Sequence, residues 1–389
     1  MKAGVPDGVK KIALSLAPED ALNAFPKWSD IIRDTAPLAE VNAPDMADLA
    51  TIVYTSGTTG MPKGVMHDFQ GLSIVGEKMI KVYNLEPNER MISYLPLSHV
   101  AERVAVEIAV LYVGNKIFFA ESLDTFGEDI KRAQPTVFFA VPRIWSKFYQ
   151  KASEAVPPKK LNTLLKIPFL NKIIKKKVLG AMGLDECRIA LSGAAALSPD
   201  IITWFKKLDL EILEVYGMTE GGLSTALNCE AFPDKWGTVG RPGEGVDMRV
   251  IDDRGQELPV GEFGELVGRA PSMTPGYHNL ADKTAELLWR DAEGNVFIRS
   301  GDMGRIDGDG FVHLMDRKKD MIISGGFNIY AADLEAVLGQ HPDVTDTAVI
   351  AIPSEAWGET PLGFVVLRDG AGVTGEDVLR FANARLGKT

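Results

Sequence analysis

The 389-residue sequence contains little cysteine and has no long apolar run. Its two cysteines, Cys187 and Cys229, form no CxxC pair, so they indicate neither a disulfide framework nor a zinc site; we expect both thiols to be buried. No uninterrupted apolar run approaches the roughly 18 residues that a membrane span requires. The first residues, MKAGVPDGVKK, lack the apolar core of a signal peptide. These absences together predict a cytoplasmic protein.

An excess of positive charge is also absent, because the net charge is −11. This balance argues against a general nucleic-acid binder, and the length predicts two or three domains. Residues 1–235 carry a net charge of −1 with 21 Lys and 6 Arg, whereas residues 236–389 carry −10 with 4 Lys and 11 Arg. Domains of one protein often differ in charge. A change this abrupt in the type of base also fits a hybrid of two parent sequences.

The first two thirds of the sequence alternate between strand-like and helix-like segments. Residues 49–54 (LATIVY) predict a buried strand, and apolar residues at helical spacing predict a helix over 68–83. Further strands are predicted at 116–120, 136–141, 188–193 and 210–217, with a helix beginning near Ser198 and Pro199. Such alternation favours an α/β domain with a largely parallel sheet, which gathers ligands at the carboxyl ends of its strands.

From Gly237 onward, short segments broken by glycine and proline predict an antiparallel β region. After residue 320 a compact pattern predicts a helix over 331–340 and strands at 345–353 and 362–367. The predicted organisation is therefore a large domain made of an α/β part (1–235) and a β-rich subdomain (236–316), a hinge (317–320) and a small α+β C-terminal domain (321–389).

The segment YTSGTTGMPKGV, residues 54–65, predicts a phosphate-binding loop. Its three glycines allow backbone N–H groups to surround an anion, its hydroxyls add donors, and Lys63 adds positive charge. The P-loop pattern GxxxxGK[ST] fails because Pro62 stands where that pattern has its second glycine. We expect this loop to connect a strand to a helix and to hold phosphate differently from a P-loop NTPase.

The segment resembles the phosphate-binding signature of the adenylate-forming superfamily, which includes acyl-CoA synthetases, aryl-CoA ligases and luciferases. Further segments resemble other motifs of the superfamily in the same order: SGAAAL (192–197), YGMTE (216–220), SGD (300–302), DRKKD (316–320) and SGGFNIY (324–330). The resemblance implies the adenylate-forming fold. It also implies a reaction in which a carboxylate and ATP yield an acyl-adenylate and pyrophosphate, after which coenzyme A takes the acyl group.

The resemblance also implies which residues bind ATP, Mg²⁺ and coenzyme A. Phosphate contacts fall on Thr55, Ser56, Gly57, Thr58, Thr59, Gly60 and Lys63, and adenine contacts fall on the backbone of Gly193, Ala194 and Ala195. Tyr216 would stack on adenine, Gly217 and Thr219 would line the nucleotide with Thr219 on the α-phosphate, Glu220 would bind Mg²⁺, and Asp302 would accept the ribose hydroxyls. Arg317 would contact ribose or phosphate, Lys319 stands at the hinge position, and Gly326 would line the coenzyme A channel. For Arg317 and Lys319 the alternative is a solvated run of charges.

Some assignments leave alternatives open. His99 matches a family histidine near the acyl carboxylate, but a single histidine is often structural; the catalytic set implied by the resemblance is Lys63, His99, Thr219 and Glu220. Residues 94–107 and 141–151 resemble the long-chain fatty acyl-CoA synthetase branch, which favours a fatty acid substrate, whereas the sequence after 236 is closer to medium-chain and aryl-acid ligases. Residues 156–184 carry seven lysines and no acidic residue, which indicates either a solvated helical face or a surface that contacts anionic membranes.

The sequence also departs from the superfamily pattern. Only 53 residues precede the phosphate loop, where relatives carry more than a hundred, and the chain ends at LGKT before the PxxxGK-like motif with the family's catalytic lysine; Lys388 is not that residue. We therefore expect a chain shortened at both ends, with impaired adenylation. The alternative to an acyl-CoA ligase is a nucleotide-binding fragment or hybrid without turnover. An apolar sheet face left exposed would favour a homodimer.

Overall fold

The computed structural model describes residues 8–15, 17–40, 43–55, 61–168, 170–195, 197–221, 225–226, 235, 237–318, 320–324 and 327–386. The chain divides into two compact units, Met1–Asp45 and Met46–Thr389. The first unit contains two short helices, α1 (Glu19–Ala24) and α2 (Trp28–Asp34), and a bridge between Ala13 and Lys27. The predicted boundaries after residues 235, 316 and 320 stay predictions. No helix in the described ranges is long and apolar enough to cross a membrane.

The larger unit begins with an antiparallel hairpin of β1 (Leu49–Thr55) and β2 (Lys63–Asp68), in which Thr55 pairs with Lys63. The expectation that the phosphate loop leads directly into a helix is therefore wrong, because the loop connects two strands. In β2, Gly64, Val65 and His67 are buried and the other three residues are half-buried, and Val65 is completely buried, so the strand lies in the interior of the unit. Helix α3 (Phe69–Tyr83) begins only afterwards, where the Asp68 carboxylate accepts the N–H of Gly71 at 2.6 Å.

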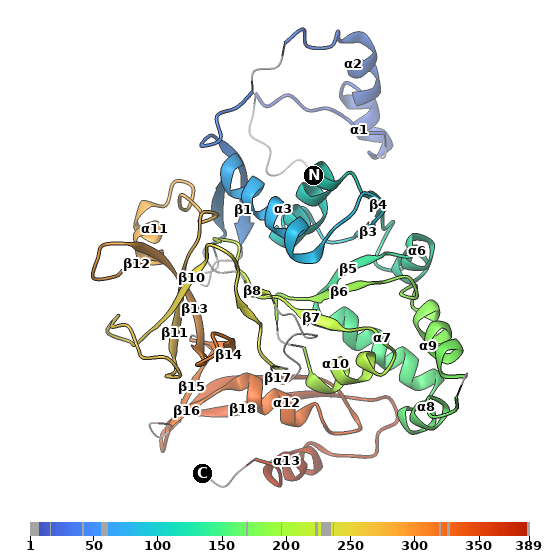
Figure 1. Cartoon of the computed structure of the whole chain (residues 1–389), viewed down its shortest axis with the longest axis vertical. Coiled ribbons are helices and arrows are strands. Elements are labelled where there is room, and N and C mark those ends of the chain that lie inside the picture. The colour runs from blue at the N-terminus through green and yellow to red at the C-terminus, as the bar shows by residue number, and fades with distance from the viewer. Residues whose placement is uncertain are drawn as a thin grey trace. The chain divides into compact units, whose positions relative to one another are not determined.

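Four of the predicted strands, together with β3, which was not predicted, form two parallel sheets within this unit. Strands β3 (Arg90–Ser93) and β4 (Lys116–Phe119) make one parallel pair, and β5 (Val137–Ala140), β6 (Ile189–Ser192) and β7 (Ile212–Glu214) make a three-stranded parallel sheet. The helices between them are α4 (Val100–Glu102), the π-helix η1 (Arg103–Ile108), α5 (Ala109–Val113), α6 (Phe126–Ala133), α7 (Pro142–Ala155), α8 (Pro158–Leu164), α9 (Leu170–Ala181) and α10 (Pro199–Lys206). Figure 1 shows α7 and α10 beside the three-stranded sheet.

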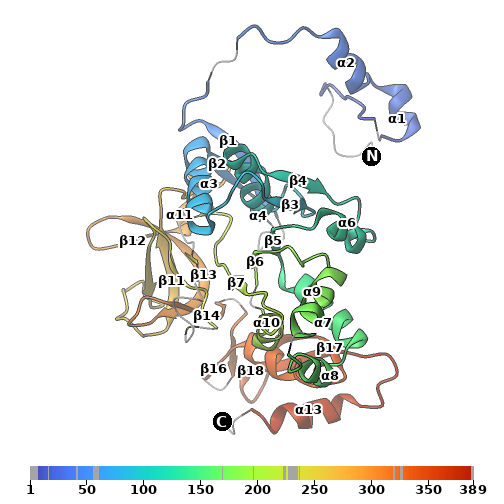
Figure 2. The same ribbon diagram turned by 45° about the vertical axis from the view of Figure 1, so that its right-hand side comes forward.

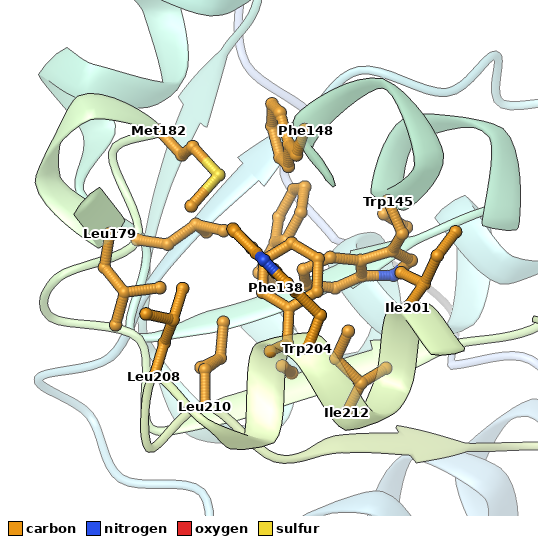
Figure 3. Close-up of a cluster of buried hydrophobic side chains, with 14 of the residues drawn as sticks. Phe138, Trp145, Phe148, Leu179, Met182, Ile201, Trp204, Leu208, Leu210 and Ile212 are labelled. Atoms are coloured by element: carbon orange, nitrogen blue, oxygen red, sulfur yellow. The ribbon is translucent and has the colours of Figure 1, made fainter. Parts of the chain in front are cut away.

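The main hydrophobic core lies between this sheet and helices α7, α9 and α10 (Figure 3). Trp145 is fully buried at its centre, packs against Phe138 and Phe205, and donates its indole N–H to the carbonyl of Leu191 at 3.3 Å. Because the aromatic rings around Trp145 meet edge to face and its indole N–H is hydrogen-bonded, this packing holds the strands in a fixed relation. It thereby fixes the carboxyl ends of β6 and β7, where the predicted adenine loop and Tyr216 follow.

The β-rich region that was predicted from Gly237 contains a five-stranded antiparallel sheet. Its strands are β10 (Asp247–Ile251), β11 (Gly264–Arg269), β12 (Leu288–Arg290), β13 (Val296–Ile306) and β14 (Val312–Arg317), in the order β10-β11-β13-β12 with β14 also on β13. Helix α11 (Ala281–Leu287) precedes β12, and the short strands β8 (Thr225–Ala226) and β9 (Arg241–Pro242) pair separately. Asp302 and Arg317 are cross-strand partners on β13 and β14.

The last part of the chain forms the predicted α+β pattern. Strands β15 (Ile322–Ser324), β16 (Phe327–Ile329), β17 (Val344–Ser354) and β18 (Gly358–Leu367) make an antiparallel sheet in the order β16-β15-β18-β17. Helices α12 (Ala331–Leu338) and α13 (Gly375–Asn383) supply the apolar side chains that pack with it, including Leu338 and Val378. The other face of β17 and β18 exposes Ile350 and Phe364.

Candidate active site

The predicted phosphate loop is only partly within the described residues. Ser56, Gly57, Thr58, Thr59 and Gly60 lie outside them, as do Lys319 of the hinge and Gly326 of the predicted coenzyme A channel. The two ends of the loop are described: Thr55 ends β1, Lys63 begins β2, and the Thr55 hydroxyl lies 3.5 Å from the Lys63 carbonyl oxygen. The pairing of Thr55 with Lys63 therefore fixes the backbone position of Lys63 at the start of β2.

Lys63 and Glu220 meet at the ring of Tyr277. The Lys63 ammonium lies 5.0 Å from the centre of that ring, and the Tyr277 hydroxyl donates a 2.6 Å hydrogen bond to Glu220 Oε1. A cation over an aromatic face is attracted by the ring quadrupole, and a hydrogen bond to a carboxylate is stronger than one between neutral groups. Tyr277 thus has a positive side chain over the face of its ring and a negative side chain at its hydroxyl.

The backbone beside Glu220 is held by the segment that carries Tyr277. Thr274 N–H donates to the Glu220 carbonyl at 2.8 Å, and the Thr274 hydroxyl donates to the Met66 carbonyl at 2.6 Å. Met66 N–H in turn donates to the Gly276 carbonyl at 3.1 Å. Residues 274–277 therefore connect β2 to the turn that bears Glu220, so the lysine strand and the glutamate turn form one assembly.

This assembly depends on glycine at position 221. Gly221 has φ +73° and lies against Ser272, whose carbonyl oxygen a Cβ atom would overlap. We expect Gly221→Ala to lower the free energy of unfolding by about 1–3 kcal/mol, because it adds left-handed strain to a backbone clash. Urea unfolding measures this loss. The control is Gly127→Ala in α6, where a Cβ would meet nothing within 4 Å and helix propensity favours alanine. Equal stability of the two variants would contradict the prediction.

A second group of predicted residues lies at the β13–β14 pair. The Tyr216 hydroxyl donates a 2.6 Å hydrogen bond to Asp302 Oδ2, and Arg317 Nε lies 3.5 Å from Asp302 Oδ1. The Ser300 hydroxyl accepts the N–H of Asp302 at 2.9 Å, which orients this carboxylate. Burial raises the pKa of Asp302, although the Tyr216 hydrogen bond and the Arg317 charge oppose the rise. An ionised carboxylate offers about four lone-pair positions, so Asp302 retains capacity for the hydroxyls of a ribose.

The two groups lie in one region of the fold, because Tyr216 packs against the hydrophobic cluster that contains Tyr277. The charge of Glu220 contributes to the raised pKa of Asp302, and Tyr216 and Glu220 belong to the same turn after β7. The charge of Glu220 also acts on His67 of β2. Burial lowers the pKa of His67, and the charge of Glu220 opposes that lowering. The imidazole Nε2 of His67 is buried without a hydrogen-bond partner among the described residues. Lys63, Glu220, Tyr216 and Asp302 are therefore parts of a single polar site.

The predicted adenine loop lies next to Tyr216 in the fold. Gly193, Ala194 and Ala195 directly follow β6, and Val215 N–H donates to the Ser192 carbonyl at 2.9 Å, which carries the parallel pairing to the end of β7. A Cβ on Gly193 would lie 3.0 Å from the Val215 carbonyl, and Ala194 has a left-handed φ of +70°. The carboxyl ends of strands β6 and β7 thus lie together at one edge of the sheet. Gly217 and Thr219 occupy the turn between Tyr216 and Glu220.

The side-chain hydrogen bond that the structure shows for His99 is local and does not connect this residue to the group around Lys63 and Glu220. It is the N-cap of α4, and its Nδ1 accepts the Ala101 N–H at 3.2 Å. Burial lowers its pKa, which favours a neutral ring. No hydrogen bond within the described ranges joins His99 to Lys63 or Glu220. The structure therefore places His99 in a local capping role, and its contact with an acyl carboxylate stays a prediction.

A divalent cation fits this site through a single carboxylate. Among the described residues, no group of three or more His, Cys, Asp or Glu side chains could hold a metal ion by itself. Glu220 Oε1 accepts the Tyr277 hydroxyl, and a carboxylate in this setting has further lone pairs for a cation. Magnesium retains several waters and usually binds through one or two carboxylates together with substrate phosphates. The donor set thus fits a Mg²⁺ ion that arrives with a nucleotide.

Comparison with known families decides the identity of the fold. Residues 3–278 match the model of the AMP-binding enzyme family, and residues 333–389 match the model of the AMP-binding enzyme C-terminal domain. The chain belongs to the AMP-binding enzyme family. The adenylate-forming fold, with a large N-terminal domain and a small C-terminal domain, is therefore confirmed.

Relatives of this AMP-binding enzyme include a feruloyl-CoA synthase of Amycolatopsis sp, 31% identical over 87% of this chain and 64% of the synthase. A 2-succinylbenzoate–CoA ligase of Geobacillus kaustophilus (strain HTA426) is 31% identical over 95% of this chain and 67% of the ligase. The structure of ATP-bound MatB from Rhodopseudomonas palustris matches with 29% identity and a TM-score of 0.74, covering 92% of this chain and 66% of MatB. The chain thus spans about two thirds or slightly less of the length of these relatives.

Three residues of the site were not predicted from the sequence: Tyr277, Thr274 and His67. Tyr277 and Thr274 belong to a segment, TPGY, whose proline and glycine indicate only a turn. His67 has no sequence neighbour that would pair it with a metal or nucleophile. The partners of Tyr277 and Thr274 lie far away in the chain, so no local spacing identifies these two residues.

Proposed function

We propose that this AMP-binding enzyme joins a carboxylic acid to coenzyme A through an acyl-adenylate, with ATP as the source of AMP. The observation that carries the proposal is the convergence of Lys63, Glu220, Tyr216 and Asp302 on one polar site. These four groups would serve the phosphates, a cation, the adenine and the ribose of one nucleotide. The names of the relatives, feruloyl-CoA synthase and 2-succinylbenzoate–CoA ligase, support acid–CoA ligation.

The reaction requires no side-chain nucleophile. A carboxylate oxygen of the acid attacks the α-phosphorus of ATP and expels pyrophosphate, and the thiol sulfur of coenzyme A then attacks the acyl carbon and expels AMP. Lys63 would stabilise negative charge on the phosphates, and the hydroxyl of Thr219 would contact the α-phosphate. A magnesium ion at Glu220, when bound, neutralises phosphate charge. Tyr277 would hold Lys63 and Glu220 in position while the nucleotide binds.

The class of acid rests on two different observations. The relatives named above act on aromatic acids according to their names. Residues 94–107 and 141–151 resemble the long-chain fatty acyl-CoA synthetase branch, which supports the fatty acid that the sequence predicted. Both classes belong in the same test, because the nucleotide site is compatible with either of them.

Acid-dependent exchange of radioactive pyrophosphate into ATP tests the proposal and the class of acid together. Ferulate, 4-coumarate and 2-succinylbenzoate are compared with octanoate, palmitate and oleate, each with and without Mg²⁺. We expect exchange with one of these classes and none without acid. Formation of the matching acyl-CoA, followed by mass spectrometry, establishes the second step.

ATP binding in calorimetry without exchange for any acid would contradict the ligase and support the alternative of a nucleotide-binding fragment. Exchange with palmitate and oleate alone would support the fatty acid prediction. Exchange with the aromatic acids alone would assign the protein to aryl-acid activation. Lys63→Ala serves as the control, because exchange that survives this substitution would not arise at the described site.

A further inference from the structure

A strongly basic surface lies away from the nucleotide site, on helices α8 and α9. Residues 156–184, which include both helices, carry seven lysines and no acidic residue. The two helices are neighbours in the fold, with α9 above α8 in the views of Figures 1 and 2. This concentration of one sign of charge contrasts with the net charge of −11 for the whole chain. The surface is therefore a local feature and not a consequence of composition.

Exposed apolar side chains are interleaved with these lysines. Ile173 is 64% exposed, and Leu170 and Ile167 precede it at 47% and 39%. Lys172, Lys176 and Lys177 are exposed around Ile173, and these four residues bound one open hollow of the surface. Positions three and four apart share one face of a helix, so Leu170, Ile173 and Lys177 lie on the same face. We call the surface of Leu170, Lys172, Ile173, Lys176 and Lys177 the α9 face.

The opposite side of α9 is anchored in the core. Leu179 is buried in the main hydrophobic cluster together with Leu161 of α8 (Figure 3 shows Leu179). Lys175, which is mostly buried, donates to Asp209 at 2.7 Å and thereby ties the helix to the end of α10. The α9 face is therefore the solvent-exposed side of a helix whose other side packs in the core. Among the residues that the structure describes, Lys176 is the one lysine of this face in an ion pair; its ammonium lies 3.3 Å from Glu186. Both partners are exposed, so solvent screens that pair.

We propose that the α9 face docks this enzyme on an anionic lipid bilayer. Lysines near an anionic membrane surface gain about 1 kcal/mol each, and exposed leucine and isoleucine side chains enter the boundary between headgroups and acyl chains. The chemistry fits lipid better than nucleic acid, because the sequence of residues 156–184 contains no arginine and a single aromatic residue, Phe169. Nucleic-acid surfaces rely on arginine forks and on aromatic stacking. The proposal holds for any acid that the enzyme activates.

Co-sedimentation of the full chain with vesicles tests this proposal. Vesicles of phosphatidylcholine alone are compared with vesicles in which phosphatidylserine replaces about a third of the lipid. We expect binding to the anionic vesicles alone and a decline of this binding with added salt. The triple variant Lys172→Glu, Lys176→Glu, Lys177→Glu is expected to bind these vesicles about 100-fold less tightly, from the loss of three lysine contributions. Lys175 is left in place because it belongs to a structural ion pair.

A charge-matched control separates this surface from net charge. Lys27→Glu, Lys81→Glu, Lys116→Glu reverses three exposed lysines elsewhere in the chain and is expected to retain binding. Circular dichroism melting checks that both triple variants are folded. Equal loss of binding in the two variants would overturn the proposal, as would unchanged binding in the α9 variant.

A second variant tests the apolar part of the surface. Leu170→Ser, Ile173→Ser keeps every lysine, so its binding should weaken by about tenfold or more while its salt dependence remains. Binding of the wild-type chain to a duplex oligonucleotide, with the same loss in the lysine triple variant and none in the Leu170 and Ile173 variant, would overturn the lipid proposal in favour of a general polyanion surface.

Discussion

Glu220→Gln is expected to lower acid-dependent ATP–pyrophosphate exchange by roughly 10²–10³-fold. The substitution keeps an oxygen that accepts the Tyr277 hydroxyl, now 2.6 Å from Glu220 Oε1, and it keeps the backbone bond from Thr274. Geometry is thus preserved and only the negative charge is lost. The loss removes the chain's proposed contact with Mg²⁺, so the largest effect should appear in the Mg²⁺-dependent rate. The measurement is exchange at saturating acid over a range of Mg²⁺ concentrations.

Tyr277→Phe provides the matched control for this prediction. It removes the hydroxyl that orients Glu220 and retains the ring that lies 5.0 Å from the Lys63 ammonium. We expect a loss of about tenfold in exchange, consistent with one hydrogen bond to a charged group. ATP affinity without Mg²⁺ should change little in either variant. A Glu220→Gln protein that exchanges as fast as the wild type, or a larger loss in Tyr277→Phe, would contradict the assignment of Glu220 to the cation.

The sequence motifs single out residues that meet in the structure, but they predict the path of the chain around them less well. Tyr216, Glu220 and Asp302 were proposed from their motifs, and the structure brings them together. The phosphate loop was expected to enter a helix, yet β2 pairs with β1. Residues 63–68 form a short segment directly before the strong helical pattern of residues 68–83, so local periodicity gives no separate signal for a strand there. The other edge of β2 contacts distant residues 276–278, through the hydrogen bonds from Met66 N–H to the Gly276 carbonyl and from His278 N–H to the Gly64 carbonyl.

The local sequence pattern likewise does not predict the contacts of Tyr277 with Glu220 and Lys63. Its hydroxyl reaches Glu220 across 57 positions in the chain, and its ring lies under Lys63 of β2. The parallel strands β5, β6 and β7 were predicted because each is a short apolar run with glycine or proline nearby. A buried strand carries its signal in its own residues. A contact between two loops of a site arises only after tertiary packing, so it has no equivalent signal.

Asp302→Asn is expected to reduce AMP affinity on the order of 10²-fold, because two hydrogen bonds from ribose hydroxyls to an ionised acceptor contribute about 1.5–3 kcal/mol each. The same substitution should leave the melting temperature unchanged or raise it. Burial raises the pKa of Asp302, so its ionised form destabilises the folded protein at pH values above that pKa. A neutral asparagine of the same shape removes this cost while still accepting the Tyr216 hydroxyl. Calorimetry with AMP and thermal melting at neutral pH measure the two effects.

Asp307→Asn is the matched control, since it makes the same chemical change where the pKa moves the other way. Burial of Asp307 opposes ionisation, but hydrogen bonds from Lys235 at 2.9 Å and His313 at 3.0 Å hold its pKa well below the usual range. A depressed carboxyl pKa contributes stability above the unfolded value, which is lost as the pH falls through the folded pKa. Asp307→Asn should therefore lower the melting temperature at neutral pH and leave AMP affinity unchanged. If Asp302→Asn instead melted at a lower temperature and bound AMP normally, Asp302 would be a structural carboxylate and the ribose would bind elsewhere.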